Sequence, residues 1–104
     1  MYDFATDRWH SRRPMPQAQG GLAAAALGHM LYVFGGEYFD NGGGVYATVW
    51  AYDTRTDQWR DAGHMPLPRH GLGAVAHDGA IYVIAGAAAA GGRGTSNRMV
   101  RYVP

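Results

Sequence analysis

The sequence repeats itself at a spacing of 50 residues, which limits the chain to folds built from copies of one unit. A shift of one period places Tyr2 on Tyr52 and Trp9 on Trp59, without a gap. The same shift places Tyr52 on Tyr102, close to the end of the printed sequence. Many of the matches are tryptophan, tyrosine and methionine, which are uncommon residues, so composition does not explain them. The chain is therefore a duplicated unit of about 50 residues.

Each copy contains four short segments with the character of strands, bounded by turn residues. In order they are "GLAAAAL" and "GLGAVAH", "MLYVFGG" and "AIYVIAG", "VYATVWAYD" and "SNRMVRYV", and "DRWHS" and "DQWRD". By propensity alone, the run Ala23 to Ala26 favours a helix. Its partner in the second copy, "GAVA", is short and flanked by glycines, so we predict a strand for both. Small side chains suit an innermost strand, where neighbouring sheets crowd around an axis.

A period of about 50 residues with four strands is typical of a kelch blade in a β-propeller. The sequence resembles the kelch family over essentially its whole length. The resemblance implies an all-β fold of four-stranded antiparallel blades, about two per chain. The second copy departs from the pattern at Ala85, where the first glycine of a pair is replaced. The residues that carry the resemblance are Gly35-Gly36 after "LYVF", the spaced Tyr52 and Trp59, and the "MP" and "RHG" of residues 65–71.

The repeat register divides the chain into three parts. We expect residues 2–13 to supply the outer strand of a split blade, residues 20–62 a complete blade, and residues 70–104 the three inner strands of the split blade. Two blades cannot close a ring, because propellers have about four to eight. Either further sequence completes the ring, or identical chains join head to tail and each lends its N-terminal strand to a neighbour. For such a ring we expect three copies.

Recognition is expected on the face that carries the loops between the second and third strands and between successive blades. In kelch propellers that bind acidic peptides, the arginine before the first strand's glycine lines the central pocket, and Arg69-His70-Gly71 matches that position. Pairing of Arg69 with a carboxylate is the alternative, and Tyr38 and Phe39 can equally pack under their loop. The candidate ligand-binding residues are Arg69, His70, Glu37, Tyr38, Phe39, Asp40, Asn41, Arg93 and Arg12.

Composition excludes several kinds of chemistry. The chain has no cysteine, which removes disulfides, thiolate catalysis and the tyrosine–cysteine cofactor of the kelch enzyme galactose oxidase. The five histidines lack metal-ligand spacing, so we expect no metal, no cofactor and no catalytic residues. The net charge is +1 and the nine arginines are scattered, which argues against nucleic acid as a partner. Apolar runs are too short to cross a membrane, and we expect a soluble, cytoplasmic chain.

These observations predict a non-enzymatic interaction scaffold that binds a peptide or protein segment through its loops. The alternative is a carbohydrate-binding or sugar-isomerising propeller, similar to sialic acid mutarotase. Isomerisation would need positioned acid and base groups, and Glu37, Asp40, Arg69 and His70 are the candidates.

Overall fold

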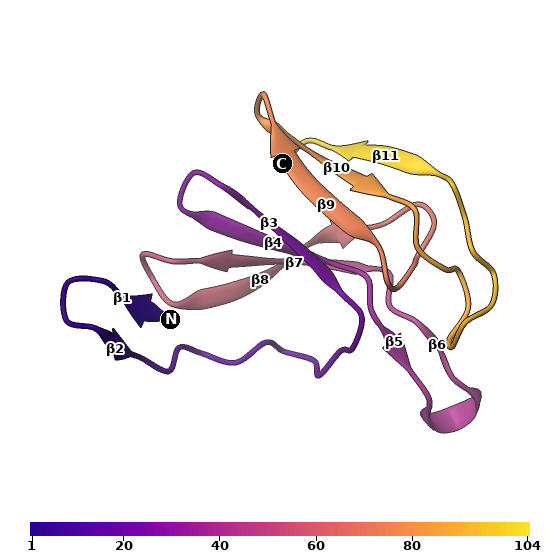
Figure 1. Ribbon diagram of the computed structural model, residues 1–104, viewed down its shortest axis with the longest axis horizontal. Helices are drawn as coiled ribbons and strands as arrows, with labels where there is room; N and C mark the ends of the chain where they lie inside the picture. The colour runs from indigo at the N-terminus through magenta and orange to yellow at the C-terminus, as the bar shows by residue number, and fades with distance from the viewer.

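The computed structural model describes residues 1–104 and is built almost entirely of short antiparallel strands (Figure 1). Two sheets form the body of the molecule, and two small hairpins project from it. The elements in chain order are β1 (Tyr2–Asp3), β2 (Arg8–Trp9), β3 (Ala23–Leu27), β4 (Met30–Phe34), β5 (Glu37–Tyr38), the short 3-10 helix η1 (Asp40–Gly42), β6 (Gly44–Val45), β7 (Thr48–Asp53), β8 (Gln58–His64), β9 (Gly73–His77), β10 (Ala80–Ile84) and β11 (Met99–Tyr102).

The first sheet has four strands in the order β3-β4-β7-β8. Neighbouring strands pair antiparallel, with Ala23 opposite Phe34 and Tyr52 opposite Trp59. The alanine run forms strand β3, so the prediction of a strand against helix propensity is correct. Tertiary pairing decides this, because β3 has an apolar partner in β4 along its whole length.

The second sheet repeats the first three strands of this pattern, in the order β11-β10-β9. Tyr82 stands opposite Val75 on one side and Arg101 on the other, as Tyr32 stands opposite Ala25 and Ala51 one period earlier. The outer edge of β11 pairs with no strand.

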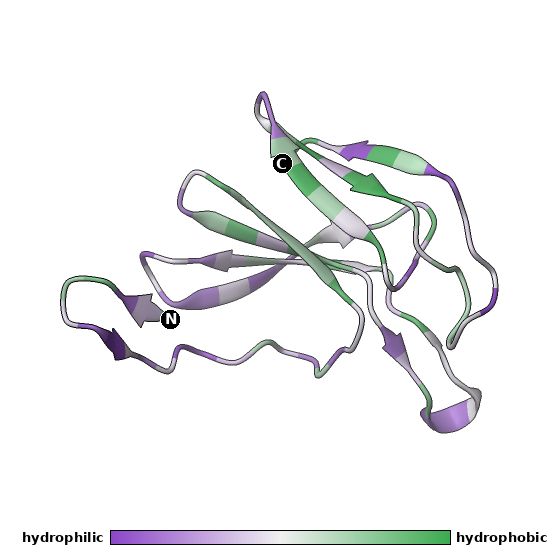
Figure 2. Cartoon of the chain, viewed as in Figure 1, coloured by the Kyte–Doolittle hydropathy of each residue, from purple (hydrophilic) through white to green (hydrophobic).

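The core lies between the two sheets, where β3 packs beside β9 (Figure 1). The Tyr102 ring lies 5.6 Å from the ring centre of Tyr32 and 5.4 Å from that of Phe34. Figure 2 shows apolar residues concentrated on β3, β9 and β10, where the two sheets face each other, while β2, β5 and η1 are hydrophilic. The fold is therefore the predicted all-β arrangement of antiparallel sheets, and these sheets do not close into a ring. The buried core residues are Tyr32, Phe34, Val49, Ala51, Met65, Ile81 and Val83.

Arg69 joins the two sheets from the inside. Its side chain is fully buried. Its Nε donates to the carbonyl of Leu67 at 3.1 Å, and its Nη1 donates to the carbonyls of Ala85 at 2.6 Å and Arg98 at 2.8 Å. Its own backbone carbonyl accepts the amide of Gly36 at 3.0 Å, from the end of β4. Burial lowers the pKa of Arg69, and the nearby positive charge of Arg98 lowers it further.

The glycine pair after β4 is what lets the second sheet approach so closely. Gly35 has φ +68°, and a Cβ atom at this position would overlap the backbone carbonyl of Arg69. Ala85 occupies the equivalent position after β10 and keeps a left-handed φ of 59°. An alanine can stand there because no further sheet packs on that side within the chain.

The N-terminal hairpin β1–β2 is attached through the segment that follows it. The backbone amide of Arg13 donates to Asp57 at 2.8 Å, and the indole of Trp59 donates to the carbonyl of Arg13 at 2.8 Å. The hydroxyl of Tyr52 also donates to Asp57, at 2.7 Å. The hydrogen bond from the Tyr52 hydroxyl lowers the pKa of Asp57 most, and the one from the Arg13 amide lowers it further.

We expect Arg69→Met to destabilise the fold by about 3 kcal/mol, because the carbonyls of Leu67 and Ala85 lose a donor, that of Arg98 keeps only the backbone amide of Ala85, and side-chain volume is roughly kept. Urea unfolding would measure the change in midpoint. Arg98→Met is the matched control, because Arg98 is exposed and contributes only its carbonyl to these hydrogen bonds. An unchanged midpoint in Arg69→Met would contradict the role assigned to this side chain.

The attachment of residues 12–13 should weaken in acid. Because the folded pKa of Asp57 is lowered, its contribution is complete above the unfolded value of about 4 and is lost as the pH falls through the lower folded pKa. The indole N–H resonance of Trp59 should shift over this range in NMR spectra. Asp57→Asn should abolish the acid-dependent shift, whereas Asp78→Asn, in an exposed turn, should keep it.

Candidate ligand-binding face

Loops from both sheets meet at one end of the molecule (Figure 1). The hairpin β5–β6, with η1 at its tip, follows β4, and residues 85–98 follow β10. Between them passes the segment that enters β9, where His70 and Ala87 exchange backbone hydrogen bonds of 3.0 and 2.9 Å. The equivalent contact one period earlier joins the amide of Glu37 to the carbonyl of Gly20 at 2.8 Å. This end is the face on which recognition was predicted.

Glu37 and His70 fasten the two loops together. The Nε2 atom of His70 lies 3.2 Å from a carboxylate oxygen of Glu37 and 2.8 Å from the carbonyl oxygen of Ala89. Because a carbonyl oxygen only accepts, Nε2 must carry hydrogen in this arrangement. The same Glu37 oxygen accepts the amide of Gly91 at 2.9 Å. The structure thus brings together these two candidate residues, in a contact that holds the loops and leaves both side chains partly exposed.

The hairpin β5–β6 divides its aromatic residues between packing and solvent. The ring of Tyr38 packs against Tyr46, with ring centres 4.9 Å apart. Phe39 is 69% exposed, and Asp40 and Asn41 beside it in η1 are also exposed. The packing alternative therefore describes Tyr38, while Phe39 at the tip is free for contact with a partner.

Two of the predicted ligand-binding residues do not belong to this face. Arg69 is fully buried, and its charge is turned toward backbone carbonyls, so it does not line an open pocket. Arg12 lies beside the turn between β7 and β8, where it donates to the hydroxyl of Tyr52 at 3.0 Å and the carbonyl of Thr54 at 3.5 Å. The segment that follows β2 starts beside the turn between β7 and β8, at one end of the first sheet. It reaches the opposite end, where the candidate loops lie, only near Gly20. The sequence pattern did not predict this path.

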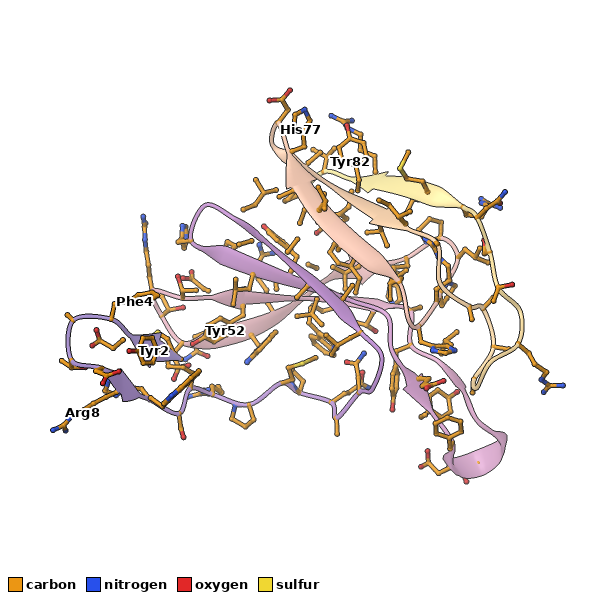
Figure 3. All side chains as sticks on the ribbon, in the orientation of Figure 1. Tyr2, Phe4, Arg8, Tyr52, His77 and Tyr82 are labelled. Carbon is orange, nitrogen blue, oxygen red and sulfur yellow. The ribbon has the colours of Figure 1, made fainter.

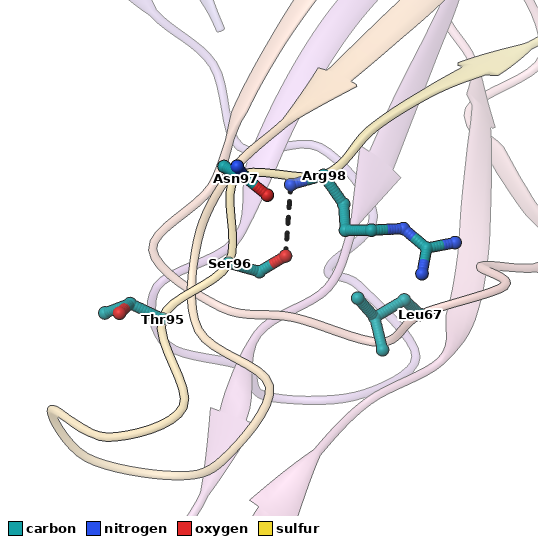
Figure 4. A pocket seen from close by; sticks show the side chains of 5 residues that line it. All are labelled: Leu67, Thr95, Ser96, Asn97 and Arg98. Atoms are coloured by element: carbon teal, nitrogen blue, oxygen red, sulfur yellow. Dashed lines mark hydrogen bonds between the residues drawn. The ribbon is translucent and has the colours of Figure 1, made fainter.

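A groove runs along residues 95–98, which lead into β11. One open hollow of about 630 Å³ is lined by Leu67 and residues 95–98 (Figure 4). A second hollow of about 390 Å³ lies against His70, and it shares Thr95 and Ser96 with the first. We call the two together the rim groove. Arg93 and Arg98 are both exposed near it, Arg93 as predicted on the loop. The sequence pattern did not indicate residues 95–98 as a site, because their counterparts in the first copy lead into an ordinary strand pairing and carry no motif.

The chemistry that the rim groove offers is hydrogen bonding. Hydroxyl, amide and guanidinium groups come from Thr95, Ser96, Asn97 and Arg98, and the Ser96 hydroxyl accepts the amide of Arg98 at 3.1 Å (Figure 4). No three histidine, aspartate or glutamate side chains of the chain converge in a way that could hold a metal ion. No helix has the length and apolar character needed to cross a membrane.

Comparison with known proteins agrees with this architecture. Residues 20–66 match the Kelch motif. In the solved structure of YjhT, a kelch-type propeller, the similar part has a TM-score of 0.71 and 26% sequence identity, and it covers 78% of this chain and 25% of YjhT. The chain thus corresponds to about a quarter of that protein's length. No curated protein sequence matches it. With two sheets of matching register, a matched Kelch motif and a similar propeller, the chain carries a kelch repeat and folds as part of a kelch-type β-propeller.

Proposed function

We propose that the chain is a non-enzymatic kelch interaction module that binds an extended peptide or protein segment in the rim groove. The observation that carries the proposal is the pair of hollows that share Thr95 and Ser96. Together they form an open trough rather than a closed pocket, and polar side chains line the part of it along residues 95–98. A trough of this kind suits an extended chain, whose backbone carbonyls and carboxylates accept the hydrogen bonds that the lining donates.

The charges around the rim groove favour an acidic segment. Arg93 and Arg98 are exposed, and no ion pair to a carboxylate occupies either of them. Glu37, the nearest acidic candidate, is already engaged by His70 and the amide of Gly91. A guanidinium group binds carboxylates well, because it can donate two parallel hydrogen bonds. Phe39 at the hairpin tip adds an exposed apolar contact on the same face.

The loops that form this face are fixed before any ligand arrives. Arg69 holds the two ends of the 85–98 loop, and the contact between Glu37 and His70 holds that loop to its neighbour. Binding to a prepared groove avoids the cost of ordering the loops. We place this groove on the rim of a ring that further kelch blades complete.

The experiment is a binding titration with a fluorescein-labelled peptide of alternating glutamate and glycine, followed by fluorescence anisotropy. We expect binding that weakens with added salt. Arg98→Ala should raise the Kd about fivefold to tenfold, the loss of roughly one charge-assisted hydrogen bond. Arg60→Ala, on the outer strand β8 and away from the groove, is the matched control and should leave the Kd unchanged.

Two results would overturn the proposal. One is an equal loss of affinity in Arg98→Ala and Arg60→Ala, which would indicate only general attraction to positive charge. The other is an absence of peptide binding together with a rise in melting temperature on adding sialic acid. That second result would favour the carbohydrate-binding or sugar-isomerising alternative, for which the hydroxyl, amide and guanidinium lining is also suited.

A further inference from the structure

The tip of the hairpin β5–β6 carries a chemically reactive pair, an asparagine followed by a glycine. The pair is Asn41 and Gly42, and both residues are exposed, as is Asp40 before them. Figures 1 and 3 show this hairpin projecting away from both sheets, with η1 at its tip. The chain has one other asparagine, Asn97, which is also exposed. The two asparagines can therefore be compared in one molecule.

The backbone of η1 has the angles of a type I′ β-turn. Asn41 has φ 52° and ψ 40°, and Gly42 has φ 88°. A type I′ turn has a φ of about +60° and a ψ of about +30° at its second residue, and a φ of about +90° at its third. The amide of Gly43 donates to the carbonyl of Asp40 at 3.0 Å and closes the turn. Asparagine and glycine favour this turn, because both tolerate a positive φ.

The side chain of an asparagine can react with the backbone of the next residue. The Gly42 amide loses its proton to hydroxide, and its nitrogen attacks Cγ of Asn41. A carbon–nitrogen bond forms, and the side-chain nitrogen takes a proton from water and leaves as ammonia. Water then opens the resulting five-membered succinimide ring. Cleavage at Cγ gives aspartate, and cleavage at the backbone carbonyl carbon gives isoaspartate. Glycine favours the attack, because it has no Cβ atom to hinder its nitrogen.

The turn as it stands protects Asn41 from this reaction. The ring places the Gly42 nitrogen on the same side of the Cα–C bond as Cβ of Asn41. For an L residue this requires a ψ of about −120°, the value at the second residue of a type II′ turn. At the observed ψ of 40°, the nitrogen lies on the side away from Cβ. Reaction therefore requires a change of backbone conformation.

A flip of one peptide plane removes this protection. The second residue of a type II′ turn has a φ of about +60°, so Asn41 already has the required φ and only its ψ must change. Rotation of the peptide between Asn41 and Gly42 makes this change and turns the φ of Gly42 negative. There is room for it, because a Cβ atom built on Gly42 would meet no other atom within 4 Å. Types I′ and II′ both connect hairpin strands, so β5 and β6 remain paired.

Asn97 lacks this freedom. The amide that would attack it belongs to Arg98, and it already donates to the Ser96 hydroxyl at 3.1 Å. The carbonyl of Arg98 is held by the guanidinium group of Arg69 at 2.8 Å. Arg98 also carries a side chain where Gly42 has none. Exposure alone does not distinguish the two asparagines, but their backbone contacts do.

We propose that Asn41 is a site of non-enzymatic modification, at which it converts to aspartate and isoaspartate through a succinimide with Gly42. Either product adds one negative charge beside Asp40, so the formal net charge falls from +1 to zero. Isoaspartate also inserts one extra atom into the backbone of the turn. Both products change the hairpin tip next to the exposed ring of Phe39. The inference does not depend on peptide binding in the rim groove.

The experiment is incubation of the full chain in mildly alkaline buffer, followed by trypsin digestion and mass spectrometry. Trypsin separates the two asparagines into different fragments. The fragment with Asn41 should gain the mass difference between an amide and an acid, and faster at higher pH, because the deprotonated amide is the nucleophile. Asn97 should react at least about tenfold more slowly. Equal rates at the two asparagines would overturn the inference.

Variants and a peptide test the route of the reaction. Asn41→Gln should abolish the mass gain, because glutamine would have to close a larger ring. Asn97→Gln is the matched control and should leave the rate at Asn41 unchanged. A free peptide of residues 37–45 should react faster than the folded chain, since no sheet holds its turn. An isoaspartate methyltransferase should methylate part of the product. Aspartate without isoaspartate would indicate direct hydrolysis, and an unchanged Asn41 in a chain whose peptide is fully converted would exclude the flip; either result would overturn the proposal.

Discussion

The buried guanidinium group of Arg69 is the contact on which both the sheet packing and the loop face depend. It donates to carbonyls at the end of β10 and just before β11, which are the two ends of the 85–98 loop. The carbonyl of Arg98 also accepts the backbone amide of Ala85 at 2.8 Å, and the guanidinium group adds a second donor there and supplies one to the carbonyl of Ala85. Arginine suits this position better than lysine, because its rigid planar fork reaches several acceptors at once and stays charged when buried. The rim groove is thus held in shape from beneath.

The two copies of the repeat allow each contact to be compared with its counterpart. Gln19 donates to the carbonyl of Gly35, as Arg69 does to that of Ala85. The second copy extends this contact, because arginine also reaches the carbonyl of Arg98. Position 85 differs as well, because an alanine there keeps the left-handed conformation that Gly35 adopts in the first copy.

Much of the fold was accessible from the repeat itself. The aromatic and glycine positions predicted the blade, and the short glycine-flanked partner of the alanine run correctly predicted that Ala23 to Ala26 form a strand. The site was accessible only in part. Glu37 and His70 do meet, and Phe39 is free, but Arg69 turns inward and Arg12 lies at the turn end of the sheet. The groove along residues 95–98 went unnoticed, because its lining depends on how two loops lie together and leaves no mark in local sequence.

The sequence by itself determined the period, the strands and the family. These depend on local alternation and on residues such as Gly36 and Trp59, which recur one period away as Gly86 and Trp9. Only the tertiary structure decided which donors face the interior and which face solvent, because side-chain direction depends on the backbone carbonyls that neighbouring loops leave unpaired. For that reason one loop arginine, Arg69, became a structural residue, while Arg93 and Arg98 remained exposed beside the groove.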